Sequence, residues 1–114
     1  MERLITSDNA EAIGRPIIEQ IITAHLNSDY DHLLAQVPTI RGKVPQEEFE
    51  EAAANLEPFG NVRSIEYLGH FAKVKEHLVL WRVRYERADE DILWHLYLSD
   101  LESEVQTVGL FFDL

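Results

Sequence analysis

The sequence contains no cysteine and has few basic residues relative to acidic ones. Without thiols there is no disulfide framework and no site that needs a thiolate, either as a metal ligand or as a nucleophile. The chain has 10 lysines and arginines against 21 aspartates and glutamates, a formal net charge of −11. This charge argues against partners such as nucleic acids or anionic membrane surfaces, because binding them requires a basic face that displaces counterions.

Long apolar runs are also missing. No stretch approaches the roughly 20 apolar residues that a bilayer-spanning helix needs. The opening MERLITSDNA contains acids and lacks the apolar region of a secretory signal. We therefore expect a cytoplasmic protein. The 114 residues are enough for one hydrophobic core and too few for two, so residues 1–114 are expected to form a single domain.

The first half of the chain has the apolar spacing of helices. An apolar stripe at three- and four-residue intervals predicts a long first helix; its members are Ile13, Ile17, Ile18, Ile21, Ile22, His25 and Leu26. Ser7 or Asp8 is the expected cap of this helix. Pro16 predicts either a kink or a regular part that begins only at residues 14–16, because proline lacks the amide donor of a helix interior.

Two further helices are expected before Gly60. The letters NSD should end the first helix, and Ser28 or Asp29 should cap a short second one. Its apolar positions are Tyr30, Leu33, Leu34 and Val37. Pro45 suits the first position of a third helix. That helix should turn Phe49, Ala52, Ala53 and Leu56 inward.

Beyond Gly60 the apolar period changes to two, which is typical of strands. Four runs, residues 62–73, 77–87, 91–99 and 104–113, are joined by short polar links. Short links between consecutive strands predict an antiparallel meander. The fold class is therefore α+β, with three N-terminal helices packed on one face of a curved four-stranded antiparallel sheet.

Tight turns between these strands predict a register. A turn at residues 88–89 would place Trp81 opposite Leu96, and a turn at residues 101–102 would place Trp94 opposite Gly109. The glycine would then leave room for the indole, so Gly109→Val should clash with Trp94. The predicted inner face comprises Val79, Trp81, Val83, Tyr85, Ile92, Trp94, Leu96, Leu98, Val105 and Phe111.

The same register leaves an apolar outer face. Its members are Leu78, Leu80, Arg82, Arg84, Leu93, His95, Tyr97, Val108, Leu110 and Phe112. A sheet face in contact with water should be polar, and such a contiguous apolar patch is more than a monomer normally exposes. We therefore predict a homodimer through this face. The alternative is that another part of the same chain covers it.

The first strand allows two registers. In the preferred one Ile65, Tyr67 and Phe71 face inward, which buries the most aromatic surface. A slip of one residue would instead turn Glu66 and His70 inward and create an acid–imidazole pair on the inner face.

The stretch AHLNSDYDHLLAQV resembles the helix–break–helix pattern of the nuclear-transport-factor-2-like superfamily. This superfamily has a cystatin-like cone fold and includes ketosteroid isomerase and SnoaL-like cyclases. The stretches PQEEFEEAAANLEPFGNVRSIEY and VGLFF are most similar to a small bacterial branch described only as a domain of unknown function. The resemblance covers residues from about Ile13 to the C-terminus and implies a cavity between helices and sheet, in which many members bind small apolar molecules.

The chain departs from the isomerase pattern, which places a catalytic aspartate shortly after the second helix. The matching region reads PTIRGKVPQ and has no acid before Glu47. We therefore favour a non-catalytic domain that binds an apolar small molecule without a cofactor. The residues expected to line its cavity are His25, Tyr67, Trp81, Tyr85 and Trp94.

Two other functions stay open at this point. One is a SnoaL-like or isomerase-like enzyme that uses Glu66, His70 or His25 as acid or base. The other is an accessory subunit that works through its sheet surface. No metal site is expected, because no two of the five histidines have the helical spacing, with a glutamate, of a zinc enzyme. For His25 alone, the favoured interpretation is a histidine at the edge of the core that is hydrogen-bonded to the backbone.

Overall fold

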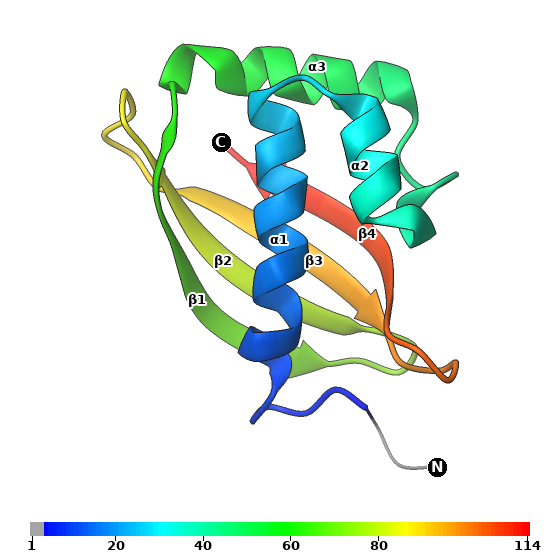
Figure 1. The fold of residues 1–114 in the computed structure, drawn as a ribbon. Helices are drawn as coiled ribbons and strands as arrows, with labels where there is room; N and C mark the ends of the chain where they lie inside the picture. Colours follow the sequence, from blue (N-terminus) through cyan, green and yellow to red (C-terminus); the bar gives the residue numbers. More distant parts are fainter. Residues whose placement is uncertain (1–3) are drawn as a thin grey trace.

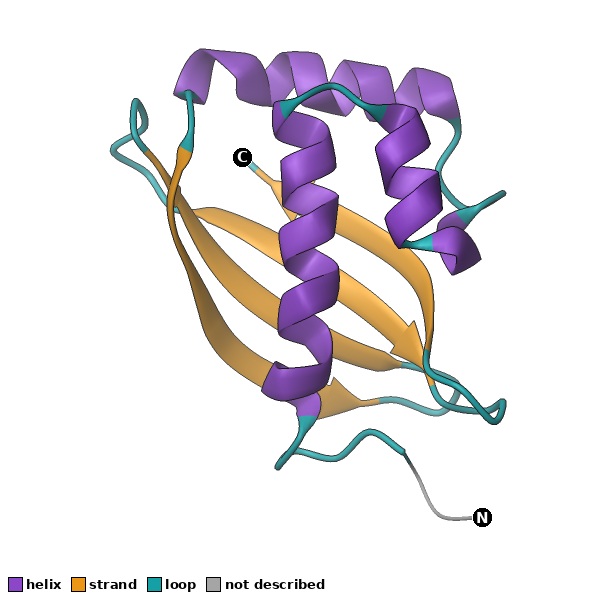
Figure 2. Cartoon of the chain, viewed as in Figure 1, coloured by secondary structure: helices purple, strands orange, loops and turns teal. Residues whose placement is uncertain are grey.

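The computed structural model describes residues 4–114, so the first three residues of the predicted domain lie outside it. The fold is α+β, with three helices and a four-stranded antiparallel sheet, as predicted (Figures 1 and 2). The helices are α1 (Ala10–Leu26), α2 (Tyr30–Gln36) and α3 (Gln46–Leu56). Short 3-10 turns follow α2 (Pro38–Ile40) and α3 (Glu57–Phe59). The strands are β1 (Val62–Ala72), β2 (His77–Tyr85), β3 (Ile92–Ser99) and β4 (Gln106–Asp113), in the spatial order β1-β2-β3-β4.

Helix α1 begins later than predicted and is not interrupted. Its N-cap is Asn9 rather than Ser7 or Asp8, and the Asn9 side chain makes no cap hydrogen bond. Instead Asn9 Oδ1 accepts the amide of Thr6 at 2.8 Å, and Nδ2 donates to the Leu4 carbonyl. These bonds stabilise the turn that leads into the helix. Pro16 lies inside α1, so a start at residues 14–16 is wrong.

The predicted break after α1 is confirmed. Ser28 has a φ of 50°, in the left-handed region that few non-glycine residues adopt. Asp29 caps α2, because its Oδ1 accepts the amide of His32 at 3.0 Å. The Tyr30 hydroxyl then donates to the Val44 carbonyl at 2.6 Å and ties α2 to the loop before α3.

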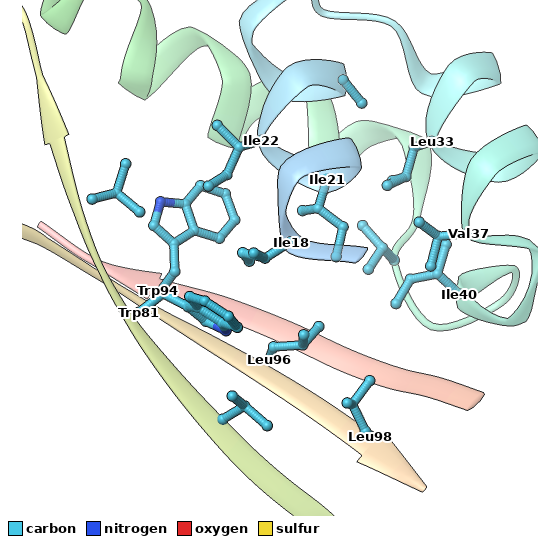
Figure 3. Packing of buried hydrophobic residues seen from close by; sticks show 14 of the residues in the cluster. Ile18, Ile21, Ile22, Leu33, Val37, Ile40, Trp81, Trp94, Leu96 and Leu98 are labelled. Carbon is cyan, nitrogen blue, oxygen red and sulfur yellow. The ribbon is translucent and has the colours of Figure 1, made fainter. Parts of the chain in front are cut away.

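The core lies between the helices and the concave face of the sheet. Figure 1 shows α1 lying across the sheet, α2 beside it, and α3 crossing the end where α1 stops. Figure 3 shows the indoles of Trp81 and Trp94 beneath Ile18 and Ile22 of α1, and both indoles are fully buried. The inner-face residues predicted on β2 and β3 are all buried, which confirms the alternation on these two strands.

The predicted register between β2 and β3 is wrong by two residues. Trp81 lies opposite Trp94 rather than Leu96, and Val83 lies opposite Ile92. The reason is a longer connection. Glu86 and Arg87 donate their amides to carbonyls of the segment before β1, at Asn61 and Phe59, instead of extending β2. Because the shift is even, every residue keeps its predicted face.

The register between β3 and β4 is also wrong, and here the faces change. Trp94 lies opposite Phe112, and Gly109 lies opposite Tyr97. The ladder is irregular at Tyr97 and Leu98, where Val108 is the extra residue of a bulge. Leu110 and Phe112, predicted outside, therefore pack against the core. Phe111, predicted inside, is 52% exposed, and a side chain at Gly109 would meet Tyr97 rather than Trp94.

A bulge in β1 combines the two registers that the sequence allows. Tyr67 lies opposite Trp81 and Gly69 lies opposite Leu80, so Leu68 is the extra residue. Before the bulge, Ile65 and Tyr67 pack against the core as preferred. After it the alternation is inverted, so His70 pairs with the buried Val79 and Phe71 is 52% exposed. The prediction that Phe71 faces inward is therefore wrong.

Candidate functional site

His25 lies at the C-terminal end of α1 with one ring nitrogen unsatisfied. Its Nδ1 is 2.7 Å from the carbonyl oxygen of Ile21, one turn earlier. Because a carbonyl can only accept, Nδ1 must carry the hydrogen, and Nε2 of the neutral ring is a bare acceptor. Nε2 is buried and has no hydrogen-bond partner among the described residues. Burial lowers the pKa of His25, with the Ile21 hydrogen bond opposing, so the ring is neutral at pH 7.

Aromatic rings surround the His25 imidazole. Its centroid lies 4.5 Å from that of Phe49 on α3 and 5.2 Å, edge to face, from that of Trp94 on β3. Phe112 on β4 lies 6.4 Å away and also packs on Trp94. Three elements that are distant in sequence thus place an unpartnered acceptor inside an apolar wall.

Two hollows meet at His25, one on each side of α3. The first, here called the α3–β4 hollow, has a volume of about 350 Å³. It is lined by His25, Lys43, Val44, Glu48, Phe49, Glu51, Ala52, Asn55, Leu110, Phe111, Phe112 and Leu114. The second, here called the α1–α3 hollow, has a volume of about 470 Å³. Its wall is more polar and includes Glu50, Ala54, Glu57, Glu86 and Arg87.

The other four predicted cavity residues do not line either hollow. Trp81, Tyr85 and Trp94 are at most 1% exposed, and they form the floor of the core. Tyr67 packs edge to face on Trp81, with 5.5 Å between the ring centroids. The structure therefore brings the five aromatic and imidazole side chains to the inner face, while only His25 adjoins open space at these two hollows.

The buried polar atoms of this floor are also unsatisfied. Trp81 Nε1, Trp94 Nε1 and the Tyr85 hydroxyl have no hydrogen-bond partner among the described residues. Burial raises the pKa of Tyr85 to about 12, although the nearby Trp94 indole acts in the opposite direction. No direct bond between Tyr85 and Trp94 meets hydrogen-bond geometry, so the neighbouring indole does not replace a partner.

A second polar cluster lies at the opposite end of α1. His77, the first residue of β2, places Nε2 3.0 Å from Oδ2 of Asp100, and both side chains are 1% exposed. The same Oδ2 accepts the amide of Ile5 at 3.1 Å. Nδ1 of His77 lies 2.8 Å from Nε2 of His70. Side chains from the ends of β1, β2 and β3 therefore form one hydrogen-bonded chain.

The hydrogen bonds that link His70, His77 and Asp100 account for the position of His70. Burial lowers the pKa of His70, the His77 imidazole lowers it further, and the Asp100 carboxylate opposes both. Sequence reasoning missed His77 and Asp100, yet a signal was present. His77 continues the odd-numbered buried alternation of β2, and Asp100 continues the even-numbered one of β3. A polar residue at such a position must find a partner when buried.

No protein-family model matches this chain, and neither the curated proteins nor the solved structures contain a significant match.

The acid–imidazole pair considered for catalysis is not brought together. Glu66 and His70 lie on either side of the β1 bulge, so their side chains leave the sheet on opposite faces. Glu66 bonds Arg82 at 2.8 Å on the outer face, where its side chain is 56% exposed. His70 is engaged by His77. Of the three candidate acids and bases, only His25 lines a hollow beside α3.

The outer face of the sheet keeps most of its predicted residues. Leu78, Leu80, Leu93, His95 and Tyr97 are intermediate in exposure, and Phe111 joins them in place of Leu110 and Phe112. Arg82 bonds Glu66 and Asp91, and Arg84 also bonds Asp91. His95 Nε2 lies 3.1 Å from Asp113 Oδ2, whereas His95 Nδ1 is buried and lacks a partner among residues 4–114.

The described residues hold neither a cluster of metal ligands nor a helix that could cross a membrane. Within residues 4–114, no group of three or more histidine, aspartate or glutamate side chains could hold a metal ion. In the same range no helix has both the length and the apolar character required to cross a bilayer.

Proposed function

We propose that this chain is a non-catalytic small-molecule-binding protein of the nuclear-transport-factor-2-like type, with the α3–β4 hollow as its ligand site. One observation carries the proposal: His25, whose buried Nε2 has no hydrogen-bond partner among the described residues, lines a hollow together with Phe49, Phe111 and Phe112. A concave, mostly apolar site with one or two polar groups is the usual form of a small-molecule site. The volume of about 350 Å³ suits a ligand of one or two rings.

The order of elements supports the superfamily assignment. A helix pair broken at Asp29, a third helix and an antiparallel meander follow one another along the chain. The strongly curved sheet that wraps beneath α1 is consistent with a cone (Figure 2). The superfamily offers a cavity between helices and sheet, and in this chain the aromatic floor of Trp81, Tyr85 and Trp94 fills the centre. We therefore propose the ligand site at the end of that interface, beneath α3.

Two alanines on α3 permit a matched test of the site. Ala52 lines the α3–β4 hollow, and Ala54 lines the α1–α3 hollow. We expect two-ring aromatic compounds, added to the labelled protein, to shift the NMR signals of Phe112 and of the Trp94 indole. Ala52→Trp should abolish these shifts by filling the hollow, and Ala54→Trp should preserve them. Loss of the shifts in both variants, or in neither, would place the binding elsewhere and reject the proposed site.

We further propose that the outer sheet face joins two copies of the chain. The centre of this face is one continuous apolar patch rather than a set of isolated apolar residues, and it comprises Leu80, Leu93, Tyr97 and Phe111. The arginines are already paired within the chain, so two such faces can approach without unpaired like charges.

Light scattering tests this second proposal. The protein should have a mass of twice 13.2 kDa. Leu80→Glu combined with Phe111→Glu should convert it to a monomer, because two carboxylates would be buried without partners. Leu101→Glu is the control, since Leu101 is 53% exposed on the loop between β3 and β4. A monomeric wild-type protein at high micromolar concentration would contradict the dimer and leave the ligand site unaffected.

A further inference from the structure

We propose that the ligand of the α3–β4 hollow carries a hydroxyl or N–H donor, which it presents to Nε2 of His25. This inference rests on the proposed small-molecule site and specifies the chemical class that the site selects. The class is that of small aromatic alcohols, with the ring against the aromatic wall and the hydroxyl directed at the imidazole.

The tautomer of His25 decides the polarity of the contact. Nδ1 donates to the Ile21 carbonyl at 2.7 Å inside the helix, and this bond fixes the hydrogen on that nitrogen. The remaining nitrogen can then only accept. A ligand that brings a carbonyl or ether oxygen would place its acceptor next to the acceptor Nε2 of His25, and no hydrogen bond could form. A ligand that brings a hydroxyl would donate a hydrogen bond to the buried Nε2 of His25. Without a partner, this buried acceptor destabilises the protein.

The residues that line the α3–β4 hollow indicate that the rest of the ligand is aromatic. The rings of Phe49 and Phe112 both lie near the imidazole, and Leu110 of β4 also lines the hollow. Aromatic rings stack or meet edge to face against such walls. The charged groups of the lining are Lys43, Glu48 and Glu51, which come from α3 and the loop before it. Acids outnumber the one base, which disfavours an anionic ligand.

Two compounds that differ only by a hydroxyl group in place of a methyl group test whether the ligand must donate a hydrogen bond. 2-Naphthol and 2-methylnaphthalene have nearly the same shape, and only the first has a hydroxyl hydrogen. We expect the wild-type protein to bind 2-naphthol about tenfold more tightly, the preference that one satisfied buried acceptor gives. His25→Phe should reverse the preference, because the more apolar methyl compound then has the advantage. His25→Gln, which keeps an acceptor, should retain part of it and serves as the variant if the phenylalanine disturbs the fold.

Two further readouts report on the atom itself. Binding of 2-naphthol, but not of its methyl analogue, should move the nitrogen-15 resonance of His25 Nε2 upfield. The naphthol preference should also disappear at acidic pH. Because the pKa of His25 is lowered, the ring stays neutral at pH 7 and gains a proton on Nε2 only below its ordinary range. The methyl compound controls for titration of Glu48, Glu51 and Lys43, which both probes experience.

The outcomes separate this inference from the proposed function. Equal binding of both probes, blocked by Ala52→Trp, would retain the ligand site and overturn the donor requirement, for instance because a bound water satisfies Nε2. Failure of both probes to bind would overturn the inference and the ligand site together. A naphthol preference that survives in His25→Phe would show that another group accepts the hydroxyl and would also overturn the inference.

Discussion

Replacement of Asp100 by alanine should lower the free energy of unfolding by about 3–5 kcal/mol, the range for removing one partner of a buried ion pair. The carboxylate accepts from His77 at 3.0 Å and from the Ile5 amide at 3.1 Å, and both side chains of the pair are 1% exposed. Without it, two buried donors lose their acceptor. Since small domains are stable by about 5–15 kcal/mol in total, much of the population would unfold under mild denaturant.

A second histidine–aspartate pair in the same sheet provides the control. Asp113 accepts from His95 at 3.1 Å, but its side chain is 53% exposed. Asp113→Ala should therefore cost less than about 1 kcal/mol, as exposed pairs do. Chemical denaturation of both variants gives the comparison. The double variant His77→Leu with Asp100→Leu should recover part of the loss, because the buried imidazole is removed together with its acceptor and only the Ile5 amide and His70 lose a partner. Equal costs for Asp100→Ala and Asp113→Ala would contradict the role assigned to the buried pair.

Gly14→Val should lower the free energy of unfolding by about 2–3 kcal/mol through overpacking. A Cβ atom at residue 14 would lie 2.9 Å from Cζ2 of Trp81, which is closer than such atoms normally approach. The indole cannot move away easily. The Arg15 guanidinium lies over its ring at 5.2 Å, and Tyr67 packs on it edge to face. The strain must therefore be taken up by the helix or by the sheet.

Gly109→Val is the matched control for this substitution. A Cβ atom there would meet the Tyr97 side chain at 3.5 Å, an ordinary contact on the outer face. We expect a change of about 0.5 kcal/mol or less, since valine suits a strand. The register expected from the sequence set Gly109 against Trp94 and predicted a clash for this substitution. A larger loss for Gly109→Val than for Gly14→Val would contradict the β3–β4 register and the packing of Trp81 on α1.

Features that repeat along the chain were predictable from the sequence. The stripe from Ile13 to Leu26 specifies one helix, and the alternation in β2 and β3 assigns each residue to the correct face. Even a register error of two residues left those faces unchanged. The local capping rule narrowed the cap of α2 to Ser28 or Asp29, and Asp29 is the cap. The same rule named Ser7 or Asp8 for α1, whose N-cap is Asn9.

Features that depend on a single extra residue were not predictable. Leu68 and Val108 are two such residues, besides an irregularity between Val62 and Ser64, and nothing in their side chains distinguishes them from ordinary strand residues. The extra residues Leu68 and Val108 invert the alternation beyond them, which is why Phe71, Leu110, Phe111 and Phe112 were assigned to the wrong faces. The position of His25 on the inner stripe was predictable. Its free nitrogen and the two hollows depend on how α3 crosses the end of the sheet, which no local pattern encodes.

The bulges also bear on how the protein avoids aggregation. They fall on β1 and β4, the two edge strands, while the ladder between the central strands β2 and β3 is regular. An edge strand with a long regular row of free amides and carbonyls is a template for a strand of another molecule. An extra residue interrupts that row and twists the edge, so a foreign strand finds only short stretches to pair with. Growth of the sheet into a fibril is thereby obstructed at both edges.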